Sequence, residues 1–264
     1  MRAFSLVELS IVLVILGLLT GGILAGQSLI RAAELRSVST EFNRWATSVH
    51  TFRDKYFAFP GDMANATAFW GALDGNNGTG TDCQGEATSL PTCNGDANGQ
   101  VLNGVSGAST AENYLFWKHL ANAGLIEGNY TGNNANKSGN VLCIGTSTML
   151  PGCNTPLSKL GTVGWAVQYV GNAAGDAHLF DGSYGNVMSL STNSTFNTTY
   201  ALTSPELWNI DTKLDDGRPA SGQLVAARWN ICATGAASTA DIANAAWILN
   251  NNSLRCTPVF RNAF

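Results

Sequence analysis

A run of 22 residues without a charged side chain, residues 9–30, constrains this chain more than any other feature. As an α-helix the run would be about 33 Å long, which is enough to cross the hydrocarbon core of a bilayer. Glu8 stands immediately before the run and Arg31 immediately after it. A carboxylate inside a membrane segment costs about 2.5–3.5 kcal/mol on insertion scales, so Glu8 needs either a partner or a function.

The residues around Glu8 resemble the N-terminal signal of type IV pilins and type II secretion pseudopilins. The similarity lies in RAFSLVE, residues 2–8, and in the apolar run that follows it. The resemblance implies that a prepilin peptidase cuts between Ala3 and Phe4 and that the new amine of Phe4 is methylated. It also implies that the helix packs into a filament, where Glu8 of one subunit neutralises the Phe4 amine of a neighbour. Ala3 replaces the family's usual Gly, and the leader, residues 1–3, is shorter than usual.

Two other interpretations of the N-terminus stay open. An ordinary secretory signal peptide also has a basic start and an apolar run, but that run is about 7–15 residues long and does not begin with a carboxylate. A plain single-pass anchor explains the hydrophobicity and leaves Phe4 and Glu8 without a role. The three interpretations therefore differ in where, if anywhere, the chain is cut.

The next segment, residues 31–59, is predicted to continue the same helix in an amphipathic form. Seven apolar side chains alternate at spacings of three and four, which places them on one stripe of a helix. They are Leu35, Val38, Phe42, Trp45, Val49, Phe52 and Tyr56. We expect the stripe to pack against a globular head, although a coiled-coil seam has the same spacing. Pro60-Gly61 should end the helix, because proline lacks a backbone donor and disfavours helix in the residue before it.

Residues 60–264 are predicted to form one α+β head around an antiparallel sheet. About 200 residues are enough for a single sizeable core. The chain thus divides into a leader (1–3), a membrane segment (4–30), an amphipathic segment (31–59) and the head (60–264). A long first helix packed on an antiparallel sheet with disulfide-stapled loops is the fold that the resemblance to pilins implies.

Six cysteines fall into three couples that are close in sequence. The expected pairs are Cys83–Cys93, Cys143–Cys153 and Cys232–Cys256. An even number of cysteines outside a membrane indicates an oxidising compartment, and proximity favours these pairs among the 15 possible connectivities. Zinc is the competing interpretation, but there is no Cys-x-x-Cys motif and the three histidines are scattered.

Local patterns predict the elements of the head. Helices are expected at 62–71, 111–123 and from 204 to about 216, with Asp62, Thr110 and Ser204 as caps. Strands are expected at 162–170, 177–180, 184–190, 223–233 and 254–260. The first three strands should form an antiparallel meander that receives the helical stripe.

Composition and motifs exclude several classes of function. Only 12% of the residues are charged, the net charge is −4 and no basic patch is present, which argues against nucleic-acid binding. No nucleophile elbow, phosphate-binding loop or His-Glu-x-x-His motif is present, so no enzymatic activity is predicted.

Calcium is the one cofactor for which the sequence offers candidate ligands. Asp74, Asn76 and Asp82 lie in a polar loop spaced like a calcium loop, but Gly85 stands where an EF-hand has its bidentate Glu. A merely flexible loop is the competing interpretation. The resemblance adds Asp215 and Asp216, because some pseudopilins hold calcium near their C-terminal end.

The function that these features predict is structural. The resemblance implies a subunit of a type IV pilus or a type II secretion pseudopilus. Its partners would be other subunits, the prepilin peptidase, an inner-membrane assembly platform and the inner membrane of a Gram-negative bacterium. The head would lie in the periplasm or on a surface filament. The alternative is a filament-displayed or membrane-anchored adhesin, which would bind through the stapled loops at 74–109 and 129–156.

Overall fold

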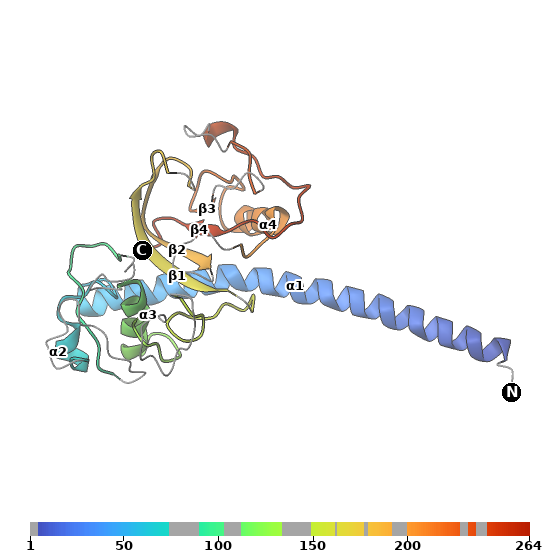
Figure 1. The fold of residues 1–264 in the computed structure, drawn as a ribbon, viewed down its shortest axis with the longest axis horizontal. Helices are drawn as coiled ribbons and strands as arrows, with labels where there is room; N and C mark the ends of the chain where they lie inside the picture. Colours follow the sequence, from blue (N-terminus) through green and yellow to red (C-terminus); the bar gives the residue numbers. More distant parts are fainter. Residues whose placement is uncertain are drawn as a thin grey trace.

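One long helix, α1 (Leu6–Tyr56), passes along a folded head and then projects far beyond it (Figure 1). The computed structural model describes residues 5–73, 90–102, 112–133, 149–161, 163–176, 179–191, 200–227, 232–235 and 242–264. The other helices of the described head are α2 (Ala66–Trp70), α3 (Glu112–Asn122) and α4 (Ser204–Leu214), with a 3-10 turn, η1 (Ile242–Asn244). The expected combination of a long N-terminal helix and an α+β head is therefore observed.

The head contains a four-stranded antiparallel sheet. Its strands are β1 (Gly164–Asn172), β2 (Ser183–Ser191), β3 (Leu224–Ala226) and β4 (Pro258–Phe260). Their order is β1-β2-β4-β3, so the C-terminal strand inserts between β2 and β3. β1 and β2 form a hairpin, with Gly164 opposite Ser191, and β3 pairs antiparallel with β4 after the connection at 227–257. The predicted meander is thus limited to this hairpin.

The strand predictions need two corrections. Leu179 and Phe180 belong to no strand; they lie in the connection between β1 and β2, where the Tyr184 hydroxyl donates to Phe180 O at 2.9 Å. The two C-terminal strands are also much shorter than expected. Just before β4, the N–H of Cys256 donates to Leu202 O at 2.9 Å. This residue is therefore paired outside the sheet, and the strand begins only at Pro258.

Two expected helix caps are wrong, and a third is not described. Asp62 does not cap α2, which begins after Asn65; its carboxylate instead accepts hydrogen bonds from a neighbouring loop. The cap of α4 is Thr203, whose side chain accepts from Glu206 N, while Ser204 Oγ donates to Cys232 O at 2.7 Å. Thr110 lies outside the described residues.

Helix α1 ends earlier than the proline suggests. Its last helical residue is Tyr56, and Phe57 takes the left-handed conformation with φ 56° while its N–H donates to Arg53 O at 2.8 Å. This cap satisfies one of the last free carbonyls of the helix. Residues 57–59 then form the turn into Pro60.

The core lies where α1 crosses the sheet and α3. Phe42 stacks on Phe260 of β4 with 4.2 Å between ring centroids, and Trp45 meets Trp117 of α3 edge to face at 5.5 Å. Val38, Phe42, Trp45, Val49 and Phe52 are all buried, and Leu35 and Tyr56 are half-buried. Each fully buried apolar side chain contributes about 1.5–3 kcal/mol. The stripe is therefore covered by the chain's own head, which removes the coiled-coil interpretation.

Disulfides secure the described part of the head. Cys232 and Cys256 form a disulfide with 5.3 Å between their Cα atoms, which links the chain after β3 to the approach to β4. Cys93 and Cys153 each take part in a further disulfide. The partners that the sequence predicts for them, Cys83 and Cys143, lie outside the described residues.

Candidate functional site

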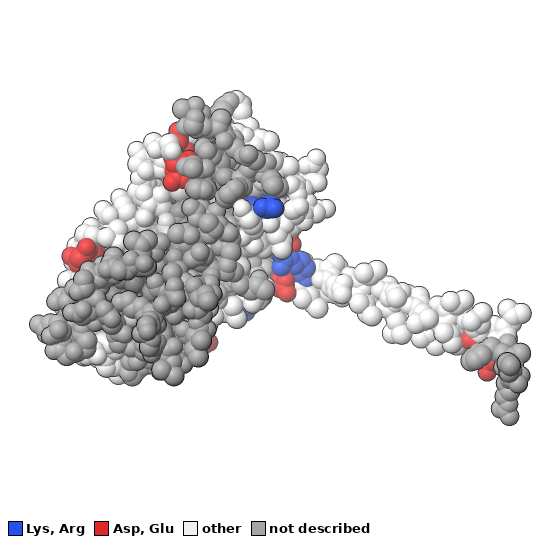
Figure 2. All heavy atoms as spheres, in the orientation of Figure 1, with Lys and Arg blue, Asp and Glu red and all other residues white. Residues whose placement is uncertain are grey.

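The projecting half of α1 is the largest uncovered apolar surface of the described chain. Its large apolar side chains between Leu6 and Ile30 are each 48% to 86% exposed. Figure 2 shows this part of the helix almost without charged side chains between the base of the head and its far end. It is long and apolar enough to cross a membrane. The four glycines of this half meet no atoms outside their own helix within 4 Å of an added Cβ, so nothing in the described part of the chain packs against them.

Glu8 lies at the outer end of this surface and caps its own helix. Ser5 N donates to Glu8 Oε2 at 2.9 Å, and Ser5 Oγ accepts from Val7 N at 3.3 Å. This is a capping box, in which two backbone donors at the helix start are satisfied reciprocally. The sequence alone suggested no partner for the Glu8 carboxylate, and the structure shows one within the chain, the N–H of Ser5. Ala3 and Phe4, the predicted cleavage residues, lie outside the described residues.

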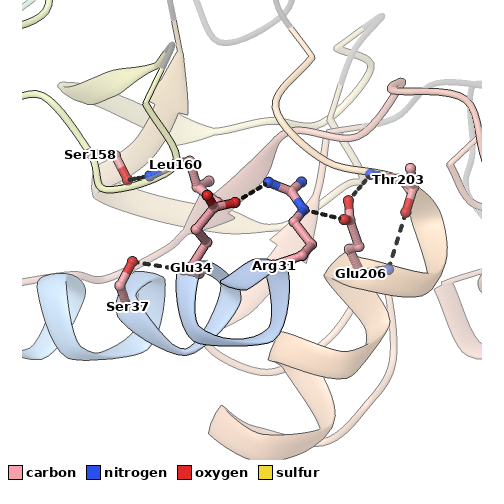
Figure 3. Close-up of polar contacts among 7 residues, drawn as sticks. All are labelled: Arg31, Glu34, Ser37, Ser158, Leu160, Thr203 and Glu206. Carbon is pink, nitrogen blue, oxygen red and sulfur yellow. Dashed lines mark hydrogen bonds and ion pairs between the residues drawn. The ribbon is translucent and has the colours of Figure 1, made fainter. Parts of the chain in front are cut away.

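At the other end of the apolar run, Arg31 joins α1 to α4. Figure 3 shows its guanidinium between two carboxylates: Nε donates to Glu206 Oε1 at 2.6 Å and a terminal nitrogen donates to Glu34 Oε2 at 3.0 Å. The second oxygen of Glu206 accepts from Thr203 N at 2.9 Å. Burial disfavours the ionised carboxylate, but the hydrogen bonds from Arg31 and Thr203 outweigh it and lower the pKa of Glu206. The ion pair thus sits where the apolar half of α1 meets the head.

A buried carboxylate fastens the packed half of α1 to the sheet. Glu41 Oε2 accepts from the indole N–H of Trp165 in β1 at 2.7 Å, and Oε1 accepts from Lys159 N at 2.9 Å. Glu41 is 9% exposed. Hydrogen bonds to a charged acceptor are stronger than neutral ones, so Glu41 fixes the register of the helix on the head.

Among the described residues, two groups of carboxylates are close enough together to hold a metal ion. The first is Asp62, Asp96 and Glu112, and its oxygens accept from backbone donors of the loop that follows Gly95 and from the side-chain amide of Asn98. Burial raises the pKa of Asp62 to about 6 and that of Glu112 to about 7. With its oxygens already bonded, this group serves to shape the loop.

The second group combines Asp215 and Asp216, which the sequence put forward, with Asp211, which it did not. Carboxylate oxygens of the three residues lie within 4.8 Å of one another at the C-terminal end of α4. The signal for Asp211 was in the sequence, because a spacing of four places it one helical turn before Asp215 on the same face. The other calcium candidates, Asp74, Asn76 and Asp82, lie outside the described residues.

Two cavities border α1, and neither carries a catalytic arrangement in the described part of the chain. A cavity of about 670 Å³ near the C-terminal end of α1 is lined by His50, Arg53, Asp54, Phe59 and Asp62, among others. One of about 370 Å³ lies between α1 and α4. His119, the one fully buried histidine of the described chain, accepts from Gly61 N at 3.0 Å and has its pKa lowered by burial to about 3, so it is a neutral core residue.

Comparisons of the chain with protein-family models, with curated proteins and with solved structures found no match.

Proposed function

We propose that this chain is a structural subunit of a type IV pilus or a type II secretion pseudopilus, which polymerises through the projecting half of α1. The observation that carries the proposal is the division of α1 into two halves. One half is covered by the head, whereas the other is apolar, free of charge over residues 9–30 and exposed on all sides.

An exposed apolar helix of this length needs a cover, because soluble monomers rarely expose large contiguous apolar patches. Lipid can provide the cover while the subunit is anchored in a bilayer. Outside the bilayer, the helices of other copies can provide it, since they offer the same length and the same apolar character. A single segment can therefore serve first as an anchor and then as the core of a filament.

Glu8 would select the position of each incoming subunit. Among the described residues, only one of its oxygens has a hydrogen-bond partner, the N–H of Ser5 at 2.9 Å. Cleavage between Ala3 and Phe4 would leave Ser5 N in place and create an amine one residue before it. The second oxygen of Glu8 could then neutralise the Phe4 amine of a neighbour, and an uncompensated charge in the apolar core would penalise any other register.

The head would be held at a fixed position relative to the bilayer surface. Arg31 is the first charge after the apolar run, and its bonds to Glu34 and Glu206 place α4 beside that point. Arginine at the end of a membrane segment favours the headgroup region.

The proposal is tested by Glu8→Gln, which keeps the size of the side chain and removes its charge. We expect normal amounts of the variant in the membrane, but at least about tenfold less of it in filaments sheared from the cells, which corresponds to a loss of about 1.4 kcal/mol per subunit contact. The matched control is Asp54→Asn, an exposed carboxylate on the head-bound half of α1, which should assemble as the wild type does. Equal filament yields for Glu8→Gln and wild type would reject the role given to Glu8.

A further inference from the structure

The cavity of about 370 Å³ between α1 and α4 gathers positive charge without a carboxylate. Arg36 of α1 and Lys213 of α4 both line it, and no Asp or Glu stands among its described lining residues. Acidic residues outnumber basic ones in the chain, 18 to 14, so such a hollow is not an average piece of its surface. We propose that this cavity binds the phosphate of an anionic phospholipid headgroup while the chain is anchored in a bilayer.

The polar side chains of the cavity have no partners of their own. In the part of the chain that the structure describes, Arg36 and Lys213 form no ion pair, and the side-chain amides of Asn43 and Asn209 form no hydrogen bond. A guanidinium, an ammonium and two amides supply many donors, and only an added ligand or water can accept from them. An anion is the ligand that matches two cations and several neutral donors at once.

Ser39, which also lines the cavity, differs from every other serine and threonine of α1. The other eight donate their hydroxyl groups to helix carbonyls three or four residues earlier. Such back-bonding is the usual arrangement for a hydroxyl inside a helix. The Ser39 hydroxyl has no partner among the described residues, although the residue is half-buried. It is therefore free to donate to a ligand in the cavity.

The cavity lies near the level of the headgroups. Arg31 ends the charge-free run and is bonded to Glu206, which holds α4 beside this point of α1 (Figure 3). Arg36 follows Arg31 by five residues, which is about 7.5 Å along a helix. The headgroup layer on each side of a bilayer is about 5–8 Å thick. Long basic side chains also extend toward the headgroups from positions beyond them.

The lining favours a phospholipid over a free phosphate ion. A guanidinium binds two phosphate oxygens at once, and an ammonium adds a point charge. Leu35, Ile210 and Leu214 line the same cavity, and they offer an apolar surface for the lipid next to its phosphate. The preceding carboxylate of α1, Glu34, is paired with Arg31 and is therefore not available to neutralise the cations.

A bound headgroup would bridge α1 and α4 beyond the Arg31–Glu206 pair. The head would then be fastened to the bilayer surface at a second point. This inference rests on the membrane-anchored state in the proposed function, and it does not depend on filament assembly.

The experiment uses the full-length protein in dodecyl maltoside micelles that contain phosphatidylglycerol or, at the same mole fraction, phosphatidylcholine. Phosphatidylcholine is the neutral control, because it carries its own cation beside the phosphate. At a tenfold excess over the dissociation constant, phosphatidylglycerol should raise Tm by about 3–6 °C above the value in phosphatidylcholine. Native mass spectrometry should show one phosphatidylglycerol retained per chain. Inorganic phosphate at about 10 mM, a concentration chosen on the scale of weak anion sites, should give a clearly smaller rise.

Three variants assign the site. Arg36→Gln and Lys213→Gln should each weaken retention of phosphatidylglycerol about fivefold, because each removes one cation near the membrane surface. Both residues are exposed, so neither change should alter Tm in phosphatidylcholine. Ser39→Ala should weaken retention without a change of charge. Lys55→Gln is the matched control: it removes an exposed cation of α1 outside the cavity and should keep the full rise in Tm.

Three results would overturn the proposal. Equal Tm values in the two lipids would exclude a site for the anionic headgroup. Equal losses in Lys55→Gln and Arg36→Gln would show diffuse attraction to the protein surface instead of a site. An equal rise with inorganic phosphate would show a site for a free anion. None of these measurements requires the peptidase or filaments, so failure here is distinguishable from a failure of Glu8→Gln to reduce assembly.

Discussion

The two halves of α1 differ both in apolar content and in surroundings. In the head-bound half the apolar side chains form one stripe, and the stripe is buried against the sheet and α3. In the projecting half they occupy every face, and every face is exposed. A stripe can be covered by a single partner surface, whereas an all-round apolar surface needs an apolar environment on all sides. The distribution of apolar residues, together with their number, separates a folding surface from a membrane or filament surface.

The sharpest test of this comparison is a pair of truncations, one in each half. Phe42→Ala removes a ring that stacks on Phe260 and should lower the free energy of unfolding of the head by about 3–5 kcal/mol. Leu13→Ala, in the projecting half, should change it by less than about 0.5 kcal/mol. Urea unfolding of the full-length protein in detergent, followed by tryptophan fluorescence, measures both. Similar losses for the two variants would contradict the division of the helix.

The head, rather than the helix, should give the stability its pH dependence. The folded state holds the proton of Glu112 up to a pKa of about 7, whereas an unfolded chain releases it near 4.5. Ionisation therefore costs the folded state, and stability should fall by about 2–3 kcal/mol as the pH rises through this interval. Asp62, with a pKa of about 6, contributes in the same direction.

The measurement for this prediction is the free energy of unfolding at several pH values between 4 and 8. Glu112→Gln should flatten the slope, even though the amide satisfies only one of the two backbone donors and lowers stability overall. Glu8→Gln is the comparison in the projecting half and should leave the slope unchanged. A slope that is equally steep in Glu112→Gln and wild type would exclude Glu112 as its source.

Substitution of Glu41, the buried carboxylate of the head-bound half, should have a different effect from substitution of Glu8, the exposed carboxylate near the N-terminal end of α1. Glu41→Gln leaves either the indole N–H of Trp165 or the N–H of Lys159 facing an amide NH₂ group. The unsatisfied donor should cost about 1–3 kcal/mol in unfolding free energy. Glu8→Gln should cost the head nothing and instead reduce assembly. A variant pair in which both changes destabilise the head, or both spare it, would contradict the separation of roles.

The smallest effect is expected at the boundary between the halves. Arg31→Ala removes the ion pairs with Glu34 and Glu206, which are partly exposed, and should cost no more than about 1 kcal/mol. The loss should shrink at high salt, because salt screens such pairs. Unfolding of wild type and variant at low and high salt provides the test. A loss that does not change with salt would show that Arg31 acts through packing of its side chain instead.

Features that depend on local pattern could be read from the sequence. The stripe on α1 and the existence of α3 and α4 follow from spacing within one segment. Sheet order could not be read in this way, because β4 is only three residues long and is placed by its pairing with two distant strands.

The caps show why neighbouring polar residues are hard to separate in a sequence. Thr203 and Ser204 both suit an N-cap, but Glu206 lies three residues after Thr203 and completes a capping box with it. Ser204 is then free to bond the distant Cys232. Asp211 is buried although it is charged, and a spacing pattern within α4 does not show which polar residue of the helix is buried.

The most direct test of the central claim is the intact mass and N-terminal sequence of the protein from native membranes, with and without its cognate prepilin peptidase. The account predicts a chain that begins at methylated Phe4 when the peptidase is present and at Met1 when it is absent. A chain that still begins at Met1 with the peptidase present, or one cut within residues 9–30, would contradict a filament subunit built on the projecting half of α1.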